Sequence, residues 1–304
     1  MRSDYLTIRD RVFRWGSRTY VMGIINVTPD SFSGDGLMAA RLGKKELQSD
    51  EHWVAAAIEQ ARDFLDAGVD ILDVGGESTR PGALPVSKAE ELARVIPVIR
   101  ALREQGNAII SVDTYRASVA QAALDAGADL VNDVWGLHAD PQIARVIGRY
   151  RVPVILMHNR SSWAHAEIKE RLGGRYVGMP YQNLLEDICR ELMESVAQAH
   201  AAGIPDDHIV LDPGIGFGKT VEQNLELIDR LGEIRDLGYP VLVGPSRKSF
   251  IGYTLDLPPD QRLEGTAAAV AISIVRGADL VRIHDVATIS RVVKMSDAIV
   301  RRQP

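Results

Sequence analysis

The chain has 304 residues, of which 46% are hydrophobic and 25% charged, so it is long and apolar enough to bury a sizeable core. Its net charge of -6 argues against a polyanionic partner such as a nucleic acid. A single cysteine, Cys189, excludes an intramolecular disulfide and a cysteine-rich metal site, and the lack of any run of about 18 apolar residues excludes a membrane span. Charged residues interrupt the first fifteen positions, so we expect no signal peptide and a cytoplasmic protein.

The first predicted element is a β-hairpin. Residues Tyr5–Trp15 alternate between apolar and polar in the manner of strands, and we expect a hairpin within residues 1–19 that caps the rest of the fold.

From residue 20 to the end, short runs rich in Val and Ile alternate with longer amphipathic or alanine-rich segments. This pattern is typical of repeated βα units. The predicted strands are Tyr20–Asn26, Val69–Asp73, Ala108–Asp113, Asp129–Asp133, Val154–His158, His208–Asp212, Pro240–Gly244 and Asp279–His284. Eight strands in a chain of this length favour a closed (β/α)8 TIM barrel, an α/β fold, over residues 20–304. We expect one domain over residues 1–304.

A short phrase recurs before three of these strands. It contains Gly68, Gly127 and Gly277, each at the point where a helix would end and a strand begin. Glycine there fits the left-handed conformation that terminates many helices, so this recurring sequence motif indicates that one supersecondary unit is repeated.

Polar residues close every predicted strand. They are Asn26, Asp73, Asp113, Asn132 with Asp133, His158, Asp212, Ser246 to Lys248, and Arg282 with His284. One such residue alone is adequately explained as a helix cap or turn residue. Eight polar strand ends together indicate an active site, because TIM barrels carry theirs at the carboxyl ends of the strands. Arg282 and His284 share one strand face, which suits an anion site.

The segment Asp212–Thr220 resembles a phosphate-binding loop but departs from it. Pro213 stands where that loop needs glycine, and Lys219 stands where a dinucleotide motif needs its third glycine. What remains is a glycine loop that presents Phe217 to a flat ligand. No zinc motif is present, so any metal would be a hard ion such as Mg²⁺, with Asn26 as the candidate ligand.

Seven segments together resemble the signature motifs of dihydropteroate synthases, in the same order. They are GIINVTPDSFS (residues 23–33), DVGGESTRPGA (73–83), SVDTY (111–115), ND (132–133), DPG (212–214), SRKSF (246–250) and RIHD (282–285). The resemblance covers the chain from about residue 20 onward. It implies an enzyme that joins 6-hydroxymethyl-7,8-dihydropterin pyrophosphate to p-aminobenzoate, giving dihydropteroate and pyrophosphate.

The resemblance also assigns site residues. Pterin binding falls to Thr79, Asp113, Asn132, Asp212 and Lys248, and a buried carboxylate at Asp212 suits the paired N–H donors of the pterin edge. Pyrophosphate binding falls to Asn26, Arg282 and His284, with Mg²⁺ held partly by Asn26. The p-aminobenzoate slot would use Phe32, Thr79, Arg80, Pro81, Phe217 and Ser249. Asn26, Lys248, Arg282 and His284 are the expected catalytic residues.

The resemblance further implies a homodimer and two mobile loops, Thr28–Gly36 and Glu77–Leu84, that close over the site. An arylamine is already nucleophilic, so no activated Ser, Cys or His is needed, and we expect pyrophosphate to leave before the amine attacks. We also expect Arg282→Ala to cripple turnover while leaving pterin-ring binding largely intact.

Two other functions are weighed against this one. A pterin-dependent methyltransferase would share the barrel and the carboxylates but would have no use for the cations Arg282 and His284. A non-catalytic pterin-binding paralogue would be expected to lose the polar residues that this chain retains. Two departures from the family pattern, Pro245 and the charged segment Arg41–Glu51, touch no assigned residue.

Overall fold

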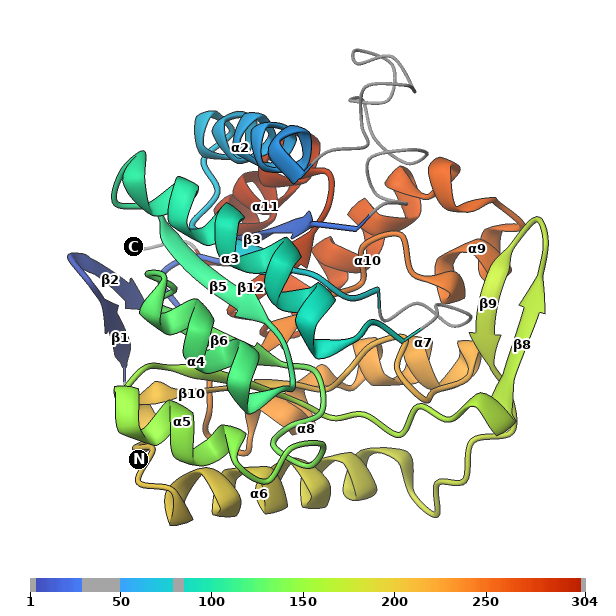
Figure 1. Cartoon of the computed structure of the whole chain (residues 1–304). Coiled ribbons are helices and arrows are strands. Elements are labelled where there is room, and N and C mark those ends of the chain that lie inside the picture. The colour runs from blue at the N-terminus through green and yellow to red at the C-terminus, as the bar shows by residue number, and fades with distance from the viewer. Residues whose placement is uncertain (1–3, 29–49, 79–84, 302–304) are drawn as a thin grey trace.

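The barrel is built from eight parallel strands. The computed structural model describes residues 4–28, 50–78 and 85–301, and within them the strands are β3 (Tyr20–Asn26), β4 (Ile71–Gly75), β5 (Ile109–Asp113), β6 (Leu130–Asp133), β7 (Val154–Met157), β10 (Ile209–Asp212), β11 (Leu242–Val243) and β12 (Leu280–Ile283). They follow one another in chain order, and β12 pairs with β3. A parallel bridge between Leu211 and Val241 joins β10 to β11 and closes the sheet. The predicted TIM barrel is confirmed (Figure 1).

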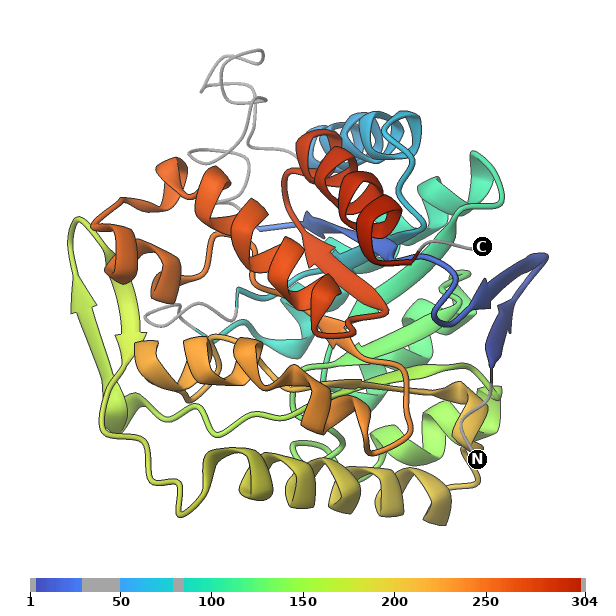
Figure 2. The ribbon, with the colours of Figure 1, turned by 180° about the vertical axis from the view of Figure 1, so that it is seen from behind.

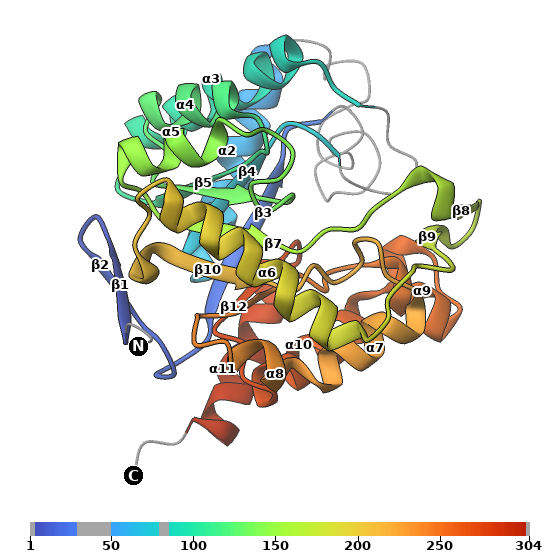
Figure 3. The same cartoon turned by 90° about the horizontal axis from the view of Figure 1, so that it is seen from below.

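The helices connect consecutive strands and lie around the outside of the barrel (Figures 1 and 3). They are α2 (Asp50–Asp66), α3 (Lys88–Glu104), α4 (Ala117–Asp125), α5 (Ile143–Tyr150), α6 (Leu184–Ala201), α7 (Val221–Asp229), α8 (Leu231–Arg235), α9 (Ser249–Leu255), α10 (Leu263–Val275) and α11 (Val286–Val300). Gly68, Gly127 and Gly277 have φ values of 84°, 111° and 104°, as predicted for helix ends. Among the described helices, none has the length and apolarity needed to cross a membrane.

The N-terminal end of the barrel is filled with apolar side chains. Every barrel strand contributes to this cluster, and β3 adds Tyr20 at its start. The other residues from the strands are Met22, Ile71, Ile109, Leu130, Ile155, Val210, Leu242 and Leu280. The hairpin of β1 (Tyr5–Ile8) and β2 (Arg11–Arg14) adds Leu6, Ile8 and Phe13 to the same cluster. The hairpin therefore caps this end, as the sequence predicts (Figure 2).

The other half of the barrel interior is mostly polar. Side chains alternate along a strand, so the residue two positions after each of these apolar residues points inward again. These residues are Ile24, Asp73, Ser111, Asn132, Met157, Asp212, Gly244 and Arg282. The sequence predicts a strand that ends at Asp73, whereas β4 continues to Gly75 and Asp73 is fully buried. Asp73 therefore lies inside the barrel and not at its mouth.

A second hairpin was not predicted from the sequence. Strands β8 (Ala166–Lys169) and β9 (Gly173–Tyr176) pair between β7 and α6. Tyr253 Oη of α9 donates to the carbonyl of Gly173 at 3.0 Å, and Arg262 Nη2 donates to the carbonyl of Leu172 at 2.8 Å. These bonds hold the hairpin against α9, at the side of the barrel (Figure 1).

Candidate active site

A pocket of about 280 Å³ opens at the carboxyl ends of the barrel strands. Among the predicted site residues, Asn26, Asp113, Lys248, Ser249, Arg282 and His284 line it. Ile168 and Leu172 of the β8–β9 hairpin form part of its wall. Phe32, Thr79, Arg80 and Pro81 lie outside the described residues, as do most of the two loops predicted to be mobile, so those assignments stay predictions.

Arg282 lies between two buried carboxylates on the barrel floor. Its Nε donates to Oδ2 of Asp73 at 2.6 Å, and its Nη2 donates to Oδ2 of Asp113 at 2.6 Å. Asn132 Nδ2 donates to the same Oδ2 of Asp73 at 3.2 Å. Side chains from β4, β5, β6 and β12 thus meet in one hydrogen-bonded cluster, and the carboxylate that joins them, Asp73, was not assigned a role from the sequence.

Burial changes the acidity of this cluster. Burial raises the pKa of Asp113, and the opposing attraction of Arg282 only partly offsets it. Burial alone would lower the pKa of the Arg282 guanidinium, but Asp73 and Asp113 together raise it, so Arg282 stays a cation. The cluster therefore holds a permanent positive charge between groups that can accept hydrogen bonds.

Asp212 lies on the far side of the barrel interior, at the end of β10. Burial raises the pKa of its carboxyl to about 6, against the hydrogen bond from the backbone N–H of Gly214 and the charge of Lys248. That N–H donates to Oδ1 at 2.7 Å, and in the described part of the chain no donor contacts Oδ2, which leaves Oδ2 for a ligand. Asp212 is thus a buried acceptor that is ionised near neutral pH.

The glycine loop after β10 folds back on itself and does not form a phosphate cradle. Gly214, Gly216 and Gly218 have φ values of 71°, 81° and 58°, and a Cβ on Gly214 would lie 1.9 Å from the carbonyl oxygen of His158. Phe217 packs with Val134 and Met157, and Lys248 Nζ lies 3.8 Å from its ring centre. Phe217, which the sequence assigns to p-aminobenzoate, and Lys248, which it assigns to the pterin, are therefore in contact.

Lys219 turns away from the ligand side and is almost fully buried beneath this loop. Its Nζ lies 3.0 Å from the carbonyl oxygens of Gly214 and Phe217 and 3.0 Å from Nδ1 of His158. The Glu191 carboxylate can only accept, so Nε2–H of the neutral His158 ring donates to it at 3.0 Å, and Nδ1 accepts from Lys219. Burial lowers the pKa of Lys219 to about 7 and that of His158 to about 4. This network was not predicted from the sequence. The only signal for it was a lysine, Lys219, that directly follows the glycine loop.

At the mouth, His284 and Arg247 are held by neighbours. Nδ1 of His284 lies 3.0 Å from Oγ of Ser246, and the His284 backbone N–H donates to the same oxygen at 3.1 Å. Arg247 pairs through Nε and Nη2 with both carboxylate oxygens of Asp285, at 2.9 and 2.5 Å. The Ser246 contact fixes the His284 ring at the pocket wall, where an anion would meet it.

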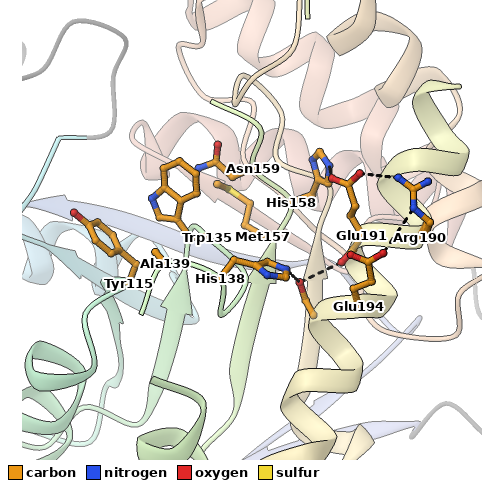
Figure 4. A pocket seen from close by; sticks show the side chains of 11 residues that line it. Tyr115, Trp135, His138, Ala139, Met157, His158, Asn159, Arg190, Glu191 and Glu194 are labelled. Atoms are coloured by element: carbon orange, nitrogen blue, oxygen red, sulfur yellow. Dashed lines mark hydrogen bonds and ion pairs between the residues drawn. The ribbon is translucent and has the colours of Figure 1, made fainter. Parts of the chain in front are cut away.

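A second pocket of about 630 Å³ lies between the carboxyl ends of β6 and β7, where Trp135 and Met157 line it, and helix α6 (Figure 4). It contains a serine beside a histidine, Ser195 and His138, whose Oγ and Nε2 lie 3.1 Å apart. The Gln198 amide donates to Nδ1 of His138, so Nε2–H must donate to the serine, whose hydroxyl in turn donates to the Glu191 carbonyl. His138 therefore cannot act as a base for Ser195, and the pair is structural.

Comparison with known proteins gives similar proteins over almost the whole chain. A family model described as "Pterin binding enzyme" matches residues 22–284. The dihydropteroate synthase of Clostridium beijerinckii is 46% identical over 298 residues, which cover 98% of this chain and 100% of that protein.

Two solved structures are similar along almost their whole length. Dihydropteroate synthase from Clostridium difficile, solved in the presence of pteroic acid, has a TM-score of 0.81 and 45% identity and covers 95% of this chain and 99% of its own. The Xanthomonas albilineans enzyme with 4-aminobenzoic acid has a TM-score of 0.84 and 38% identity and covers 99% and 100%. With identity and coverage of this extent, the chain belongs to the dihydropteroate synthase family of pterin-binding enzymes.

Proposed function

We propose that this chain joins 6-hydroxymethyl-7,8-dihydropterin pyrophosphate to p-aminobenzoate and releases 7,8-dihydropteroate and pyrophosphate, the reaction of folate biosynthesis for which its family is named. One observation carries the residue assignment: Asp113, Lys248 and Arg282 line one pocket at the barrel mouth, and the buried carboxylate of Asp212 lies near enough to interact with the charges of Lys248 and Arg282. Such a mouth suits a ligand that has a donor-rich ring at one end and a diphosphate at the other.

The buried acceptors would bind the N–H donors of the pterin ring. The free Oδ2 of Asp212 suits the adjacent N–H donors of the 2-amino-pyrimidinone edge. Asp113 and Asn132 lie across the barrel interior and would meet the remaining ring nitrogens. Lys248 would approach the carbonyl side of the ring, where its charge also offsets that of the carboxylates.

Arg282, His284 and Asn26 would bind the diphosphate, because they line the mouth above the ring site. Among the described residues, no cluster of three His, Cys, Asp or Glu side chains could hold a metal. An Asn26 amide oxygen supplemented by substrate and water oxygens nevertheless suits Mg²⁺, which rarely needs a full protein cage. When bound, Mg²⁺ would neutralise charge on the departing diphosphate.

p-Aminobenzoate would bind between Phe217, Ser249 and the loop residues Phe32, Thr79, Arg80 and Pro81, which lie outside the described residues. The amine needs no activation, since its lone pair is free near neutral pH. We propose that the C–O bond to pyrophosphate breaks first, that the amine nitrogen then bonds to the pterin methylene, and that the ammonium proton leaves to solvent or to pyrophosphate.

The test is to supply the purified chain with both substrates and Mg²⁺ and to measure dihydropteroate and pyrophosphate together. Equimolar formation of the two supports the proposal, and chelation of Mg²⁺ by EDTA should suppress both. Methyl transfer from a methylated pterin, without pyrophosphate release, would identify the methyltransferase alternative. Tight pterin binding without any turnover would identify a non-catalytic paralogue.

We also propose that the chain works in the cytoplasm as a homodimer. Helices α10 and α11 pack side by side, and Ile272, Val275, Met295 and Ile299 on them are exposed. A cluster of exposed apolar side chains on adjacent helices is what a second copy would cover. Light scattering should give twice the chain mass, and Met295→Glu should shift the protein toward monomer; a monomeric wild type would contradict this part.

A further inference from the structure

We propose that Asp73 is a positioning residue. It orients Asn132 toward the pterin ring of the substrate and Arg282 toward the diphosphate. This inference rests on the proposed function, because it concerns the same two half-sites. Asp73 belongs to β4 and is fully buried inside the barrel, below the mouth.

One oxygen of Asp73 joins the two half-sites. Its Oδ2 accepts from Nε of Arg282 at 2.6 Å and from Nδ2 of Asn132 at 3.2 Å. Arg282 is assigned to the diphosphate and Asn132 to the pterin ring. No other side chain among the described residues hydrogen-bonds to both, so Asp73 is where the two halves of the site are connected.

The first consequence concerns the polarity of Asn132. A side-chain amide has a donor end and an acceptor end, and either can face a ligand. Oδ2 of Asp73 already accepts from Nε of Arg282 and accepts a second hydrogen bond from Asn132, so Asn132 turns its NH₂ toward the barrel floor. Its Oδ1 is then left to accept from a ligand N–H, which matches a ring that offers donors.

The second consequence concerns Arg282. Nε is committed to Asp73 and one Nη2 hydrogen to Asp113, which sets the plane of the guanidinium. The remaining N–H groups, chiefly the two on Nη1, are left for oxygen atoms of the substrate. Asp73 thereby holds a long, flexible side chain in one orientation before substrate arrives, and this preorganisation lowers the entropic cost of binding.

The other oxygen supports a role beyond packing. Oδ1 of Asp73 is buried and has no hydrogen-bond partner among the described residues, and a buried carboxyl oxygen left so costs free energy. A buried apolar residue of similar size would avoid that cost. Retaining a carboxylate here is understandable if its Oδ2 contacts serve binding.

The test compares Asp73→Asn with Asp133→Asn. Asp133 is also fully buried, at the end of β6, two strands away from β4 in the sheet. Among the described residues, its carboxylate accepts only from the backbone N–H groups of Trp135 and Leu137, at 2.9 and 2.8 Å. Calorimetry would measure the Kd of 6-hydroxymethylpterin and, separately, of pyrophosphate with Mg²⁺. Asp73→Asn should weaken each by roughly ten-fold, about the effect of one charge-assisted hydrogen bond.

A purely structural role predicts a different outcome. Both variants would then lower the melting temperature, and the Kd values of folded Asp73→Asn would match those of the wild type, which would overturn the proposal. Weakening of the same size in Asp133→Asn would also overturn it, because any buried charge would then suffice.

A wild-type crystal structure with bound 6-hydroxymethylpterin keeps the test decisive if Asp73→Asn does not fold. The proposal requires Oδ2 of Asp73 to contact both Asn132 and Arg282 while Oδ1 of Asn132 meets a ring N–H. Loss of either contact would overturn it. The proposed function is judged separately, by dihydropteroate formation in the wild type: a wild type that makes none refutes that function, whereas an active wild type with unchanged Asp73→Asn affinities refutes only this inference.

Discussion

The buried His158 makes the stability of the protein depend on pH in a way that one substitution isolates. Burial, and then the neighbouring Lys219 ammonium, lower the pKa of His158 from 6.5 to about 4, against the hydrogen bond with Glu191. In the unfolded chain the imidazole regains its ordinary pKa. Between these two values, the unfolded state therefore binds a proton that the folded state does not.

The sign and size of the effect follow from this difference. Stability contributed by neutral His158 is fully present above about pH 6.5 and is lost progressively as the pH falls toward about 4. One pKa unit corresponds to about 1.4 kcal/mol, so the total loss is roughly 3 kcal/mol. Burial raises the pKa of Asp133 and of Asp212 to about 6, and these acids change the stability in the opposite direction over the same range. The wild-type profile alone therefore cannot reveal His158.

The comparison of the wild type with His158→Gln removes that difficulty. Urea unfolding, followed by circular dichroism between about pH 7 and about pH 4, gives the difference in unfolding free energy at each pH. Glutamine does not titrate, so the advantage of the wild type should shrink by roughly 3 kcal/mol as the pH falls. His200→Gln removes a histidine whose side chain is 45% exposed and serves as the control. An advantage that is the same at both ends of the range would refute the assignment.

Three further predictions concern ligand binding. The affinity for 6-hydroxymethylpterin should fall as the pH drops below about 7, because burial raises the pKa of Asp113 to about 7 and that of Asp212 to about 6, and protonation of each removes an acceptor. In the same calorimetric titration, Asp212→Asn should bind weakly and keep only the step due to Asp113; a profile that does not change with pH in the wild type would contradict this. Lys219→Met should raise KM for p-aminobenzoate by roughly ten-fold, because the carbonyl of Phe217 loses its donor; steady-state kinetics with an unchanged KM would contradict this. Arg282→Ala should weaken binding of the free pterin as well as of pyrophosphate, because it leaves the carboxylates of Asp73 and Asp113 close together without their shared cation. If calorimetry shows loss of pyrophosphate binding alone, the expectation from the sequence, that pterin-ring binding stays largely intact, holds instead.

The barrel and most of its polar interior could be predicted because both depend on local pattern. Strands of Val and Ile bounded by Gly and Asp have a period of two, and in a parallel barrel their carboxyl ends must converge. That reasoning correctly brings Asp113, Lys248, Arg282 and His284 to one pocket. The strand pattern predicts where each polar residue lies along its strand. It does not predict which residue on another strand forms a hydrogen bond with it.

The features that the sequence did not predict all depend on contacts between residues far apart in the chain. Asp73 is separated from Arg282 by 209 residues, and their hydrogen bond exists only because β4 and β12 flank β3 in the closed sheet. Lys219 matched a nucleotide motif by spacing, but its side chain turns under its own loop to meet His158 from β7. The β8–β9 hairpin was missed because its apolar content is slight and tertiary bonds from Tyr253 and Arg262 hold it in place.

The arrangement around Arg282 changes how the anion site is understood. A cation that faced only the solvent would attract any diphosphate, including the product. In this barrel the guanidinium already donates to Asp73 and Asp113, so an anion gains only the N–H groups that those carboxylates leave free. A pterin ring that offers N–H donors to Asp113 would draw that carboxylate away from the cation and strengthen the diphosphate contact. Pyrophosphate without the ring would lack this help, so the Asp113–Arg282 pair would favour release of the product, while the Asp73 contact keeps Arg282 oriented in both cases.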